Sequence, residues 1–300
     1  RQVVGGFASS LDADAAGVEG STYVWTPEQL RDVLGDDDGN WAAALFGVTD
    51  AGTFEHGTST LQLRQDPDDS ARYADIRRRL LDARSARPQP ARDDKVVTAW
   101  NAMAVTALAE AGAASGHPDW VELAVEVLTE LLDNHLVDGV LRRSSLGGLV
   151  GTPVAALDDH AALITAMLTV YQITGEQRWC EQGLALLDTT IDTFADPDEQ
   201  GAWFDAASDS LIARPRDPAD GATPAGASLI AEAALIASAI ARMGPATRYA
   251  SIVDATLARG AVLLAKVPRS AGHWLAVAEA RQGGPLQIVV AEDSRTDGEL

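Results

Sequence analysis

Three helix-length segments of the chain are apolar on nearly every face, at residues 96–114, 161–173 and 223–241. A helix of this kind must be buried on all sides, because it has no polar face to turn toward water. An acidic, turn-prone cluster precedes each segment: Asp93-Asp94-Lys95, Asp158-Asp159-His160 and Asp220-Gly221. An Asp before a helix caps the free N–H groups of the first turn and suits the helix dipole. If the three helices run parallel, their acidic starts gather at one end of a buried core.

Each apolar segment is followed by an amphipathic one, at residues 121–136, 180–194 and 248–266. The first two turns read Gly-x-x-x-Trp, and their Gly suits a left-handed helix C-cap. We expect Trp120 and Trp179 to wedge between the paired helices, with Tyr249 as an approximate third counterpart. The acidic clusters recur every 61 to 65 residues, which predicts stacked helical hairpins with inner and outer helices.

Two architectures alternate inner and outer helices in this way, a closed (α/α) toroid and an open solenoid. The long links favour the toroid, because solenoid repeats usually have about 34 to 47 residues and short turns. Six hairpins of this length need roughly 370 to 390 residues, so the toroid is expected to be incomplete. The predicted fold class is all-α: an incomplete (α/α) toroid of helical hairpins. Short β-hairpin excursions are expected in the long loops, near Gly5-Gly6-Phe7 and at residues 138–141 and 201–205.

We expect one toroid domain over residues 1–300. Its parts are an irregular N-terminal region (1–92), three inner and outer helix pairs (93–285) and a tail (286–300) that carries a strand at 286–290. In the N-terminal region, Thr26 followed by Pro27 and Gln29 predicts a helix start, and residues 41–46 and 73–86 are further helix candidates. The chain begins at Arg1 without an initiator Met, so it is expected to be a fragment or a trimmed form, without a signal peptide.

The net charge of −21 argues against partners such as nucleic acid or an anionic membrane surface. The arginines between Arg72 and Lys95 are interpreted as a solvated helix surface rather than a recognition patch. Cys180 is the only cysteine, so no intrachain disulfide can form and a cytoplasmic location fits. The histidines show no zinc spacing and no apolar stretch reaches membrane-spanning length. Neither a cofactor, a metal nor a membrane span is expected.

Several ordered motifs are shared with one known family. They are Gly5-Gly6-Phe7, Tyr23-Val24-Trp25-Thr26, Asp93-Asp94-Lys95 with Trp100-Asn101, Leu157-Asp158-Asp159, and Asp220-Gly221-Ala222-Thr223-Pro224. In these the chain resembles the thioredoxin-domain-containing proteins related to spermatogenesis-associated protein 20. The resemblance implies a thioredoxin-like domain followed by a six-hairpin toroid, similar to sugar 2-epimerases and several glycosidases. Only the toroid part matches, and the chain has no Cys-x-x-Cys. A thioredoxin-like domain of the full-length protein is therefore an expected partner.

In such a toroid the inner-helix starts and long loops form an acidic funnel. Facing carboxylates with aromatic platforms suit a carbohydrate-like ligand, since one acid can protonate a leaving oxygen while another activates water. The predicted catalytic residues are Asp94, Asp159 and Glu55 as acids and His160 as a base for epimerase-like chemistry. The predicted ligand-binding residues are Trp25, Asp93, Lys95, Trp100, Asn101, Asp158, Arg214 and Asp220.

Each of these residues also has an ordinary structural interpretation. A single Asp at a helix start is most often an N-cap worth about 1 kcal/mol, although a pair leaves the second Asp available. Lys95 can pair with Asp93 or Asp94, and Trp100 can be a core residue.

Three hypotheses therefore stand: a hydrolase or epimerase, a noncatalytic toroid that binds a ligand or docks a thioredoxin-like domain, and a plain helical scaffold. An enzyme predicts converging acids with a raised pKa. The noncatalytic toroid predicts a pocket whose carboxylates are held by helix N-termini or arginines. The scaffold predicts an exposed apolar groove.

Overall fold

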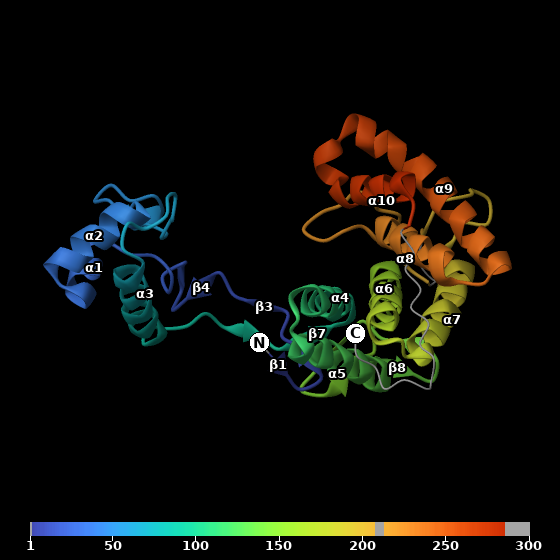
Figure 1. The fold of residues 1–300 in the computed structure, drawn as a ribbon, viewed down its shortest axis with the longest axis horizontal. Helices are drawn as coiled ribbons and strands as arrows, with labels where there is room; N and C mark the ends of the chain where they lie inside the picture. The colour runs from blue at the N-terminus through green and yellow to red at the C-terminus, as the bar shows by residue number, and fades with distance from the viewer. Residues whose placement is uncertain (1, 208–212, 286–300) are drawn as a thin grey trace, which may run out of the picture. The chain divides into compact units, whose positions relative to one another are not determined.

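The computed structural model describes residues 2–207 and 213–285, and it divides the chain into two units (Figure 1). Unit 1 comprises Arg1–Ala8 and Asp94–Leu300, and unit 2 comprises Ser9–Asp93. The strand predicted at residues 286–290 lies outside the described residues. In the part of the chain that is described, no helix is long and apolar enough to cross a membrane.

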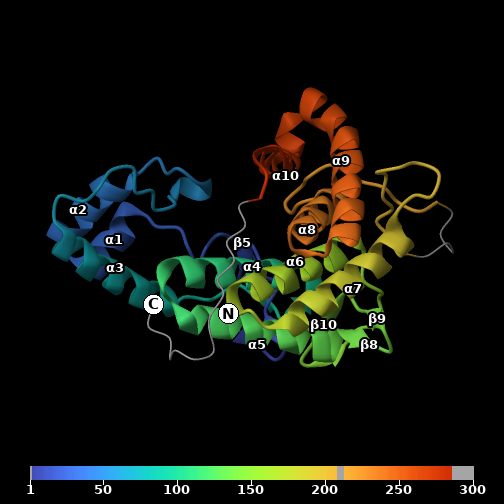
Figure 2. The ribbon, with the colours of Figure 1, turned by 45° about the vertical axis from the view of Figure 1, so that its right-hand side comes forward.

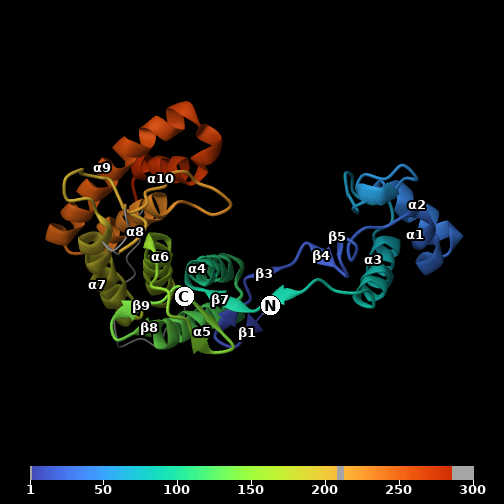
Figure 3. The same ribbon diagram turned by 180° about the vertical axis from the view of Figure 1, so that it is seen from behind.

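Unit 1 contains three helical hairpins among its described residues. The inner helices are α4 (Thr98–Ser115), α6 (Leu157–Thr174) and α8 (Gly226–Ile240), and the outer helices are α5 (Pro118–His135), α7 (Gln177–Phe194) and α9 (Met243–Lys266). Each inner helix packs on its own outer helix, α4 packs on α6, and α6 packs on α8 (Figures 1 and 3). This arrangement of successive inner helices confirms the predicted all-α class and the incomplete (α/α) toroid.

Burial differs among the three inner helices. In α6 every residue from Ala161 to Val170 is buried, as its all-round apolar surface predicts, because α4, α7 and α8 surround it. In α4 the buried residues fall on part of the helix, and Trp100 remains exposed. An apolar composition therefore predicted complete burial correctly only where neighbours exist on every side.

The turns between paired helices agree only in part with the predicted glycine C-caps and tryptophan wedges. Gly116 and Gly175 adopt the left-handed conformation at the ends of α4 and α6, as predicted. Trp179 is buried in the core, which confirms the wedge. Trp120 is instead 38% exposed and stacks on the ring of His117 with centroids 4.5 Å apart, so the wedge prediction was wrong there.

Short β-hairpins occupy the loops of unit 1. The predicted ones are β1 (Gln2–Val3) with β2 (Gly6–Phe7), and β8 (Leu136–Val137) with β9 (Val140–Leu141). The sequence did not predict a three-stranded antiparallel sheet in the order β11 (Leu149–Val150), β10 (Ser144–Leu146), β7 (Lys95–Val97). Residues 201–205 contribute only an isolated bridge between Trp203 and Ala195.

One further helix, α10 (Gly272–Gly283), follows the short 3-10 turn at Pro268–Ser270. It packs on α8 and α9, so in chain order and packing it takes the place of the next inner helix (Figure 2). Its sequence is short and mixed, with His273 and Arg281 among apolar residues, and it carries no acidic cluster of the kind that precedes the other inner helices. For that reason the sequence pattern did not predict it.

Unit 2 is a small helical unit with its own core. It contains α1 (Pro27–Leu34), α2 (Asp36–Phe46) and α3 (Ser70–Ser85), with a 3-10 turn at Glu55–Gly57. Thr26 and Gln29 form the predicted capping box at the start of α1. Two strand pairs complete the unit: β3 (Ser10–Leu11) with β6 (Arg92–Asp93), and β4 (Asp14–Ala15) with β5 (Val18–Glu19). Trp25, Leu30 and Ile76 are among its core residues.

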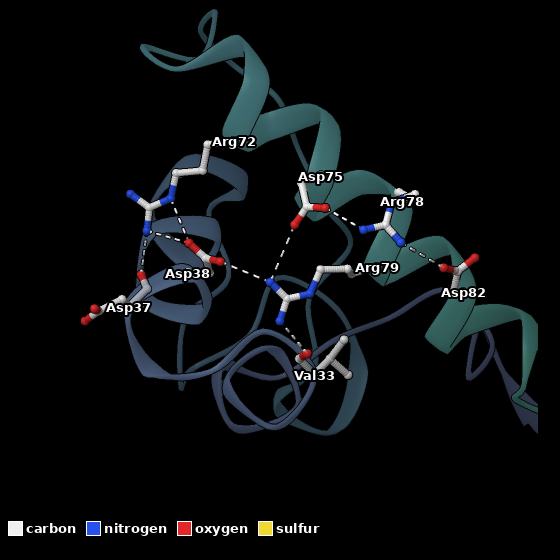
Figure 4. Close-up of polar contacts among 8 residues, drawn as sticks. All are labelled: Val33, Asp37, Asp38, Arg72, Asp75, Arg78, Arg79 and Asp82. Atoms are coloured by element: carbon white, nitrogen blue, oxygen red, sulfur yellow. Dashed lines mark hydrogen bonds and ion pairs between the residues drawn. The ribbon is translucent and has the colours of Figure 1, made fainter.

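The arginines of α3 are used inside unit 2. Arg72 and Arg79 both pair with Asp38 of α2, at 2.8 and 3.1 Å, and Arg79 also donates to the Val33 carbonyl (Figure 4). Arg78 pairs with Asp75 and Asp82 along the helix surface. These contacts fit an internal and solvated role for the arginine run rather than a nucleic-acid patch.

Candidate functional site

Asp159 joins the N-termini of two inner helices. Its Oδ2 accepts a hydrogen bond from the Ala156 N–H at the start of its own helix, α6, at 2.9 Å. Its Oδ1 accepts one at 3.0 Å from the Ala99 N–H in the first turn of α4. The side chain is fully buried. One carboxylate thus satisfies orphan donors of two helices and fixes them side by side.

Arg143 bridges the two adjacent aspartates at this helix junction. Its Nη1 lies 2.7 Å from Asp159 Oδ2 and 3.0 Å from Asp158 Oδ1, and its Nη2 donates to Asp158 Oδ2. Asp158 is 26% exposed, whereas Asp159 is buried. The guanidinium therefore neutralises the buried acid from one side and orients the more exposed acid from the other.

Burial is the largest influence on the titration of Asp159. It raises the pKa of Asp159 to about 6, with repulsion from Asp158 adding to the effect. The Arg143 charge and the two backbone donors act in the opposite direction. The hydrogen bonds that Arg143 donates to Asp158 in turn raise the pKa of Arg143, so the guanidinium stays charged.

Asp220 forms a second junction with the same design. Its Oδ1 accepts from the Ala225 N–H before α8 and from the Ser228 hydroxyl, and its Oδ2 accepts at 2.8 Å from the His273 N–H in the first turn of α10. Like Asp159, this aspartate links the starts of two neighbouring inner helices. At Asp159 and Asp220, the acid that precedes an inner helix is therefore a tie between two helices.

A cavity of about 460 Å3 opens at these helix starts, and we call it the acid pocket. Its charged lining residues are Arg143, Asp158, Asp205 and Asp217, and backbone around Thr223 and Gly226 completes it. Asp205 Oδ2 accepts from the Asp217 N–H at 2.7 Å. Burial raises the pKa of Asp205, and repulsion from Asp217 and Asp158 adds to the shift. Three carboxylates and one guanidinium thus face a single cavity.

A more apolar cavity of about 300 Å3 shares Asp205 and Asp217 with the acid pocket. Trp203, Trp274 and Leu263 line it, and the Trp203 indole N–H donates to Thr256 at 3.0 Å. The Trp274 indole N–H donates to the Pro218 carbonyl. Polar and aromatic surfaces therefore adjoin along one edge, as they do in pockets for amphiphilic ligands.

The structure places His160 beside the junction, in the first turns of α6. Its Nδ1 lies 2.9 Å from the Ala156 carbonyl and donates to it, and its ring packs against Phe194 with centroids 5.0 Å apart. Burial lowers the pKa of His160, so the imidazole is neutral at neutral pH. It is absent from the lining of the acid pocket. Its predicted role as a base stays a prediction.

The other candidates in unit 1 have varied surroundings. Asn101 is buried and bonds the backbone of Phe7 in both directions, at 2.7 and 3.2 Å, so it anchors the N-terminal hairpin to α4. Trp100 is 43% exposed, Lys95 is exposed at the start of β7, and Asp94 is half-buried just before that strand. Arg214 donates to the carbonyls of Ala206 and Thr193 and stacks on Phe204.

Three predicted residues belong to unit 2. Trp25 is 1% exposed in the core of that unit, with the Arg87 guanidinium 3.8 Å from its ring centroid, so its ring faces are already covered. Glu55 is exposed in the 3-10 turn. Asp93 is half-buried in β6, where it pairs with Ser10 of β3.

The sequence did not indicate Arg143, Asp205 or Asp217 as site residues. Arg143 lies in the short link between β9 and β10, and Asp205 and Asp217 lie between α7 and α8, where no periodicity marks the direction of a side chain. The nearest signal was the aromatic and acidic stretch at residues 201–205. Within the described residues, no group of three or more His, Cys, Asp and Glu side chains is placed to hold a metal ion.

Comparisons with known proteins show which sequences this chain is similar to. A scan against protein-family models finds no match. Spermatogenesis-associated protein 20 of Mus musculus is 29% identical over 76% of this chain, and the Homo sapiens protein is 28% identical over the same share. An uncharacterized Caenorhabditis elegans protein is 28% identical over 61% of the chain. The chain spans only 35% of the length of the mouse and human relatives.

Among solved structures, the chain is similar to a GH76 α-mannanase of Bacteroides thetaiotaomicron. The TM-score is 0.47 with 16% sequence identity, over 58% of this chain and 47% of that one. The relationship proposed from the motifs rests instead on the sequence comparisons. The chain is related to spermatogenesis-associated protein 20.

Proposed function

We propose that the acid pocket binds a neutral, polyhydroxylated ligand of the carbohydrate class. The observation that carries the proposal is the fixed pair of Asp158 and Arg143, joined by two hydrogen bonds in the cavity wall. A sugar hydroxyl donates to a carboxylate and accepts from a guanidinium, so the pair can bind one hydroxyl group or two adjacent ones. Because the protein already holds both groups in place, little conformational entropy is lost on binding.

The charge of the pocket favours a neutral ligand over an anionic one. Asp158, Asp205 and Asp217 outnumber the single guanidinium in the lining. A phosphorylated or carboxylated sugar would therefore meet net repulsion at close range. The adjoining cavity with Trp203 and Trp274 supplies apolar surface for the C–H face of a sugar ring or for an aglycone.

The hydrogen bonds support binding more strongly than turnover. The carboxylate of Asp159 bonds two backbone donors and Arg143, and that of Asp220 bonds two backbone donors and Ser228. Carboxylates committed in this way are not available to transfer protons. This is the pattern expected of a noncatalytic toroid.

A binding screen tests the proposal. Neutral mono- and disaccharides are titrated into the full chain and followed by calorimetry, together with Asp158→Asn, Asp205→Asn and, as an exposed control on α5, Glu126→Gln. We expect at least one sugar to bind the wild type and the control equally, with about tenfold weaker binding to each pocket variant. Absence of binding by every sugar, or equal affinity in all four proteins, would refute the proposal.

One observation favours glycoside hydrolysis as a second candidate. Asp205 has a raised pKa in the pocket wall, while Asp158 is ion-paired with Arg143. Glycosidases use two carboxyl groups in different environments, and the burial of Asp205 and the Arg143 contact of Asp158 give this pair such a difference. If the pocket hydrolyses glycosides, Asp205→Asn will abolish release of p-nitrophenol from an aryl glycoside even at saturating concentrations of the glycoside. Unchanged release in that variant, or no release by the wild type, would exclude this role for Asp205.

A further inference from the structure

A separate cavity of about 180 Å3 lies between the inner helices α4, α6 and α8 and the start of α10. Five polar side chains from four different helices line it: Thr106, Glu110, Thr165, Glu232 and His273. Most of the remaining lining is apolar, for example Met103 and Leu229. Glu110 is exposed and Glu232 is half-buried, so two carboxylates that play no part in the helix junctions line a cavity that is open to solvent.

Thr165 provides an observation independent of the acids. Its side chain lies in the middle of the buried stretch of α6 and is only 5% exposed. Its Oγ1 has no hydrogen-bond partner among the described residues, although Thr106, in the same lining, bonds the Ala102 carbonyl. A buried hydroxyl without a partner costs free energy unless a ligand group bonds it.

The charges in this cavity favour a positive ligand group. Burial raises the pKa of Glu110, and repulsion from Glu232 adds to the shift. His273 Nε2 lies 3.5 Å from Glu232 Oε2 without a hydrogen bond, so this contact leaves acceptor capacity on the glutamate. A cation between the two carboxylates would relieve their mutual repulsion.

We propose that this cavity binds the ammonium group of a small primary amine. An ammonium group has three N–H donors and no acceptor, which matches the Glu110 carboxylate, the Glu232 carboxylate and the Thr165 hydroxyl. A bare metal ion fits less well, because the described residues hold no cluster suited to one. The apolar lining accommodates the carbon chain of the amine. This inference does not rest on the carbohydrate proposal, which concerns the acid pocket.

The test uses the full chain with propylammonium chloride as the probe and calorimetry or ligand-observed NMR as the readout. Its comparison ligands are 1-propanol, which is neutral, and tetramethylammonium, which is cationic but has no N–H donor. All titrations have the same ionic strength, because a chain of charge −21 attracts cations nonspecifically. We expect propylammonium to bind the wild type about tenfold or more tightly than either comparison ligand.

Matched variants locate the site. Glu110→Gln and Glu232→Gln should each weaken propylammonium binding about tenfold, and Thr165→Val about threefold. Glu126→Gln, on the exposed side of α5, should bind like the wild type. The proposal is overturned if tetramethylammonium or propanol binds the wild type as tightly as propylammonium, or if both glutamine variants keep the wild-type Kd. The ligand comparison needs only the wild type, so it decides the matter even if a variant misfolds.

Discussion

The Asp159 carboxylate at the start of α6 accepts a hydrogen bond from the backbone N–H of Ala99 in α4, at 3.0 Å. Sixty positions of chain separate these residues, yet together they set the spacing of two inner helices. The same role falls to Asp220 and His273 for α8 and α10. In two of its three occurrences, the acidic repeat in the sequence thus supplies an aspartate that ties one inner helix to a neighbour.

Replacing Asp159 with Ala should destabilise unit 1 strongly. The substitution leaves the Ala99 and Ala156 N–H groups and part of the Arg143 guanidinium without their acceptor in a buried place. We expect the free energy of unfolding to fall by about 2–4 kcal/mol. Asp158→Ala removes only the half-exposed partner of the same arginine and should cost about 0–1 kcal/mol. Urea denaturation of both variants measures the difference, and equal losses would contradict the dual-cap role.

The raised pKa of Asp159 predicts how stability depends on pH. An acid whose pKa is about 6 when folded, against about 4 when unfolded, binds more protons in the folded state between these values. Its contribution therefore stabilises the fold as pH falls from about 7 to about 4, by at most roughly 3 kcal/mol.

The amide side chain of Asp159→Asn does not take up a proton in this pH range. The free energy of unfolding of the wild type, relative to that variant, should therefore increase as the pH falls from about 7 to about 4. Denaturant titrations at several pH values measure this difference. A difference that stays constant with pH would mean that the carboxylate titrates normally.

Asp220→Ala should loosen the start of α10. The variant loses the acceptor for the His273 N–H and for the Ala225 N–H before α8. We expect backbone amides in the first turns of α10 to exchange about tenfold faster or more, since losing a cap costs about 1–2 kcal/mol. Hydrogen exchange read by mass spectrometry or NMR reports this locally. Asp217→Ala, three residues away and exposed, serves as control and should leave exchange in α10 unchanged.

Gly260→Ala should destabilise the contact between α9 and α10. A methyl group on Gly260 would overlap the indole ring of Trp274, which is 2% exposed. Despite the higher helix propensity of Ala, we expect a loss of about 1–3 kcal/mol from overpacking. Gly283→Ala, at the end of α10 with open space around it, should be neutral or slightly stabilising. Thermal unfolding of the two variants compares them, and a stable Gly260→Ala protein would show that the ring moves freely.

The sequence predicted the regular parts of the fold well because they follow periodicity. The inner and outer helices, the left-handed glycines at 116 and 175 and the Thr26 capping box all come from local rules that tertiary structure did not override. The sequence did not predict the hairpin of β10 and β11 or the helix α10, because each is short and mixed in polarity. Their formation depends on the partners β7 and α8.

The sequence predicted where along the chain the candidate site lies, at the starts of the inner helices, but not which side chains line it. The acidic clusters marked the inner-helix starts, and Asp158 does line the acid pocket. Whether an aspartate faces the cavity, like Asp158, or the helix junction, like Asp159, depends on helix packing that no local pattern encodes. Arg143 and Asp205 were missed for the same reason, since loop conformation alone brings them to the cavity.

The chain order of the two units has a consequence for synthesis. Residues 1–8 belong to unit 1, although unit 2 separates them from the rest of it, and Asn101 of α4 is what holds Phe7 in place. On the ribosome, the first hairpin therefore emerges long before its binding site on α4 exists. Unit 2 is complete by Asp93, with its two ends already joined through β3 and β6. Because unit 2 has a core of its own, it can fold as an insertion before α4 is available to bind residues 2–8.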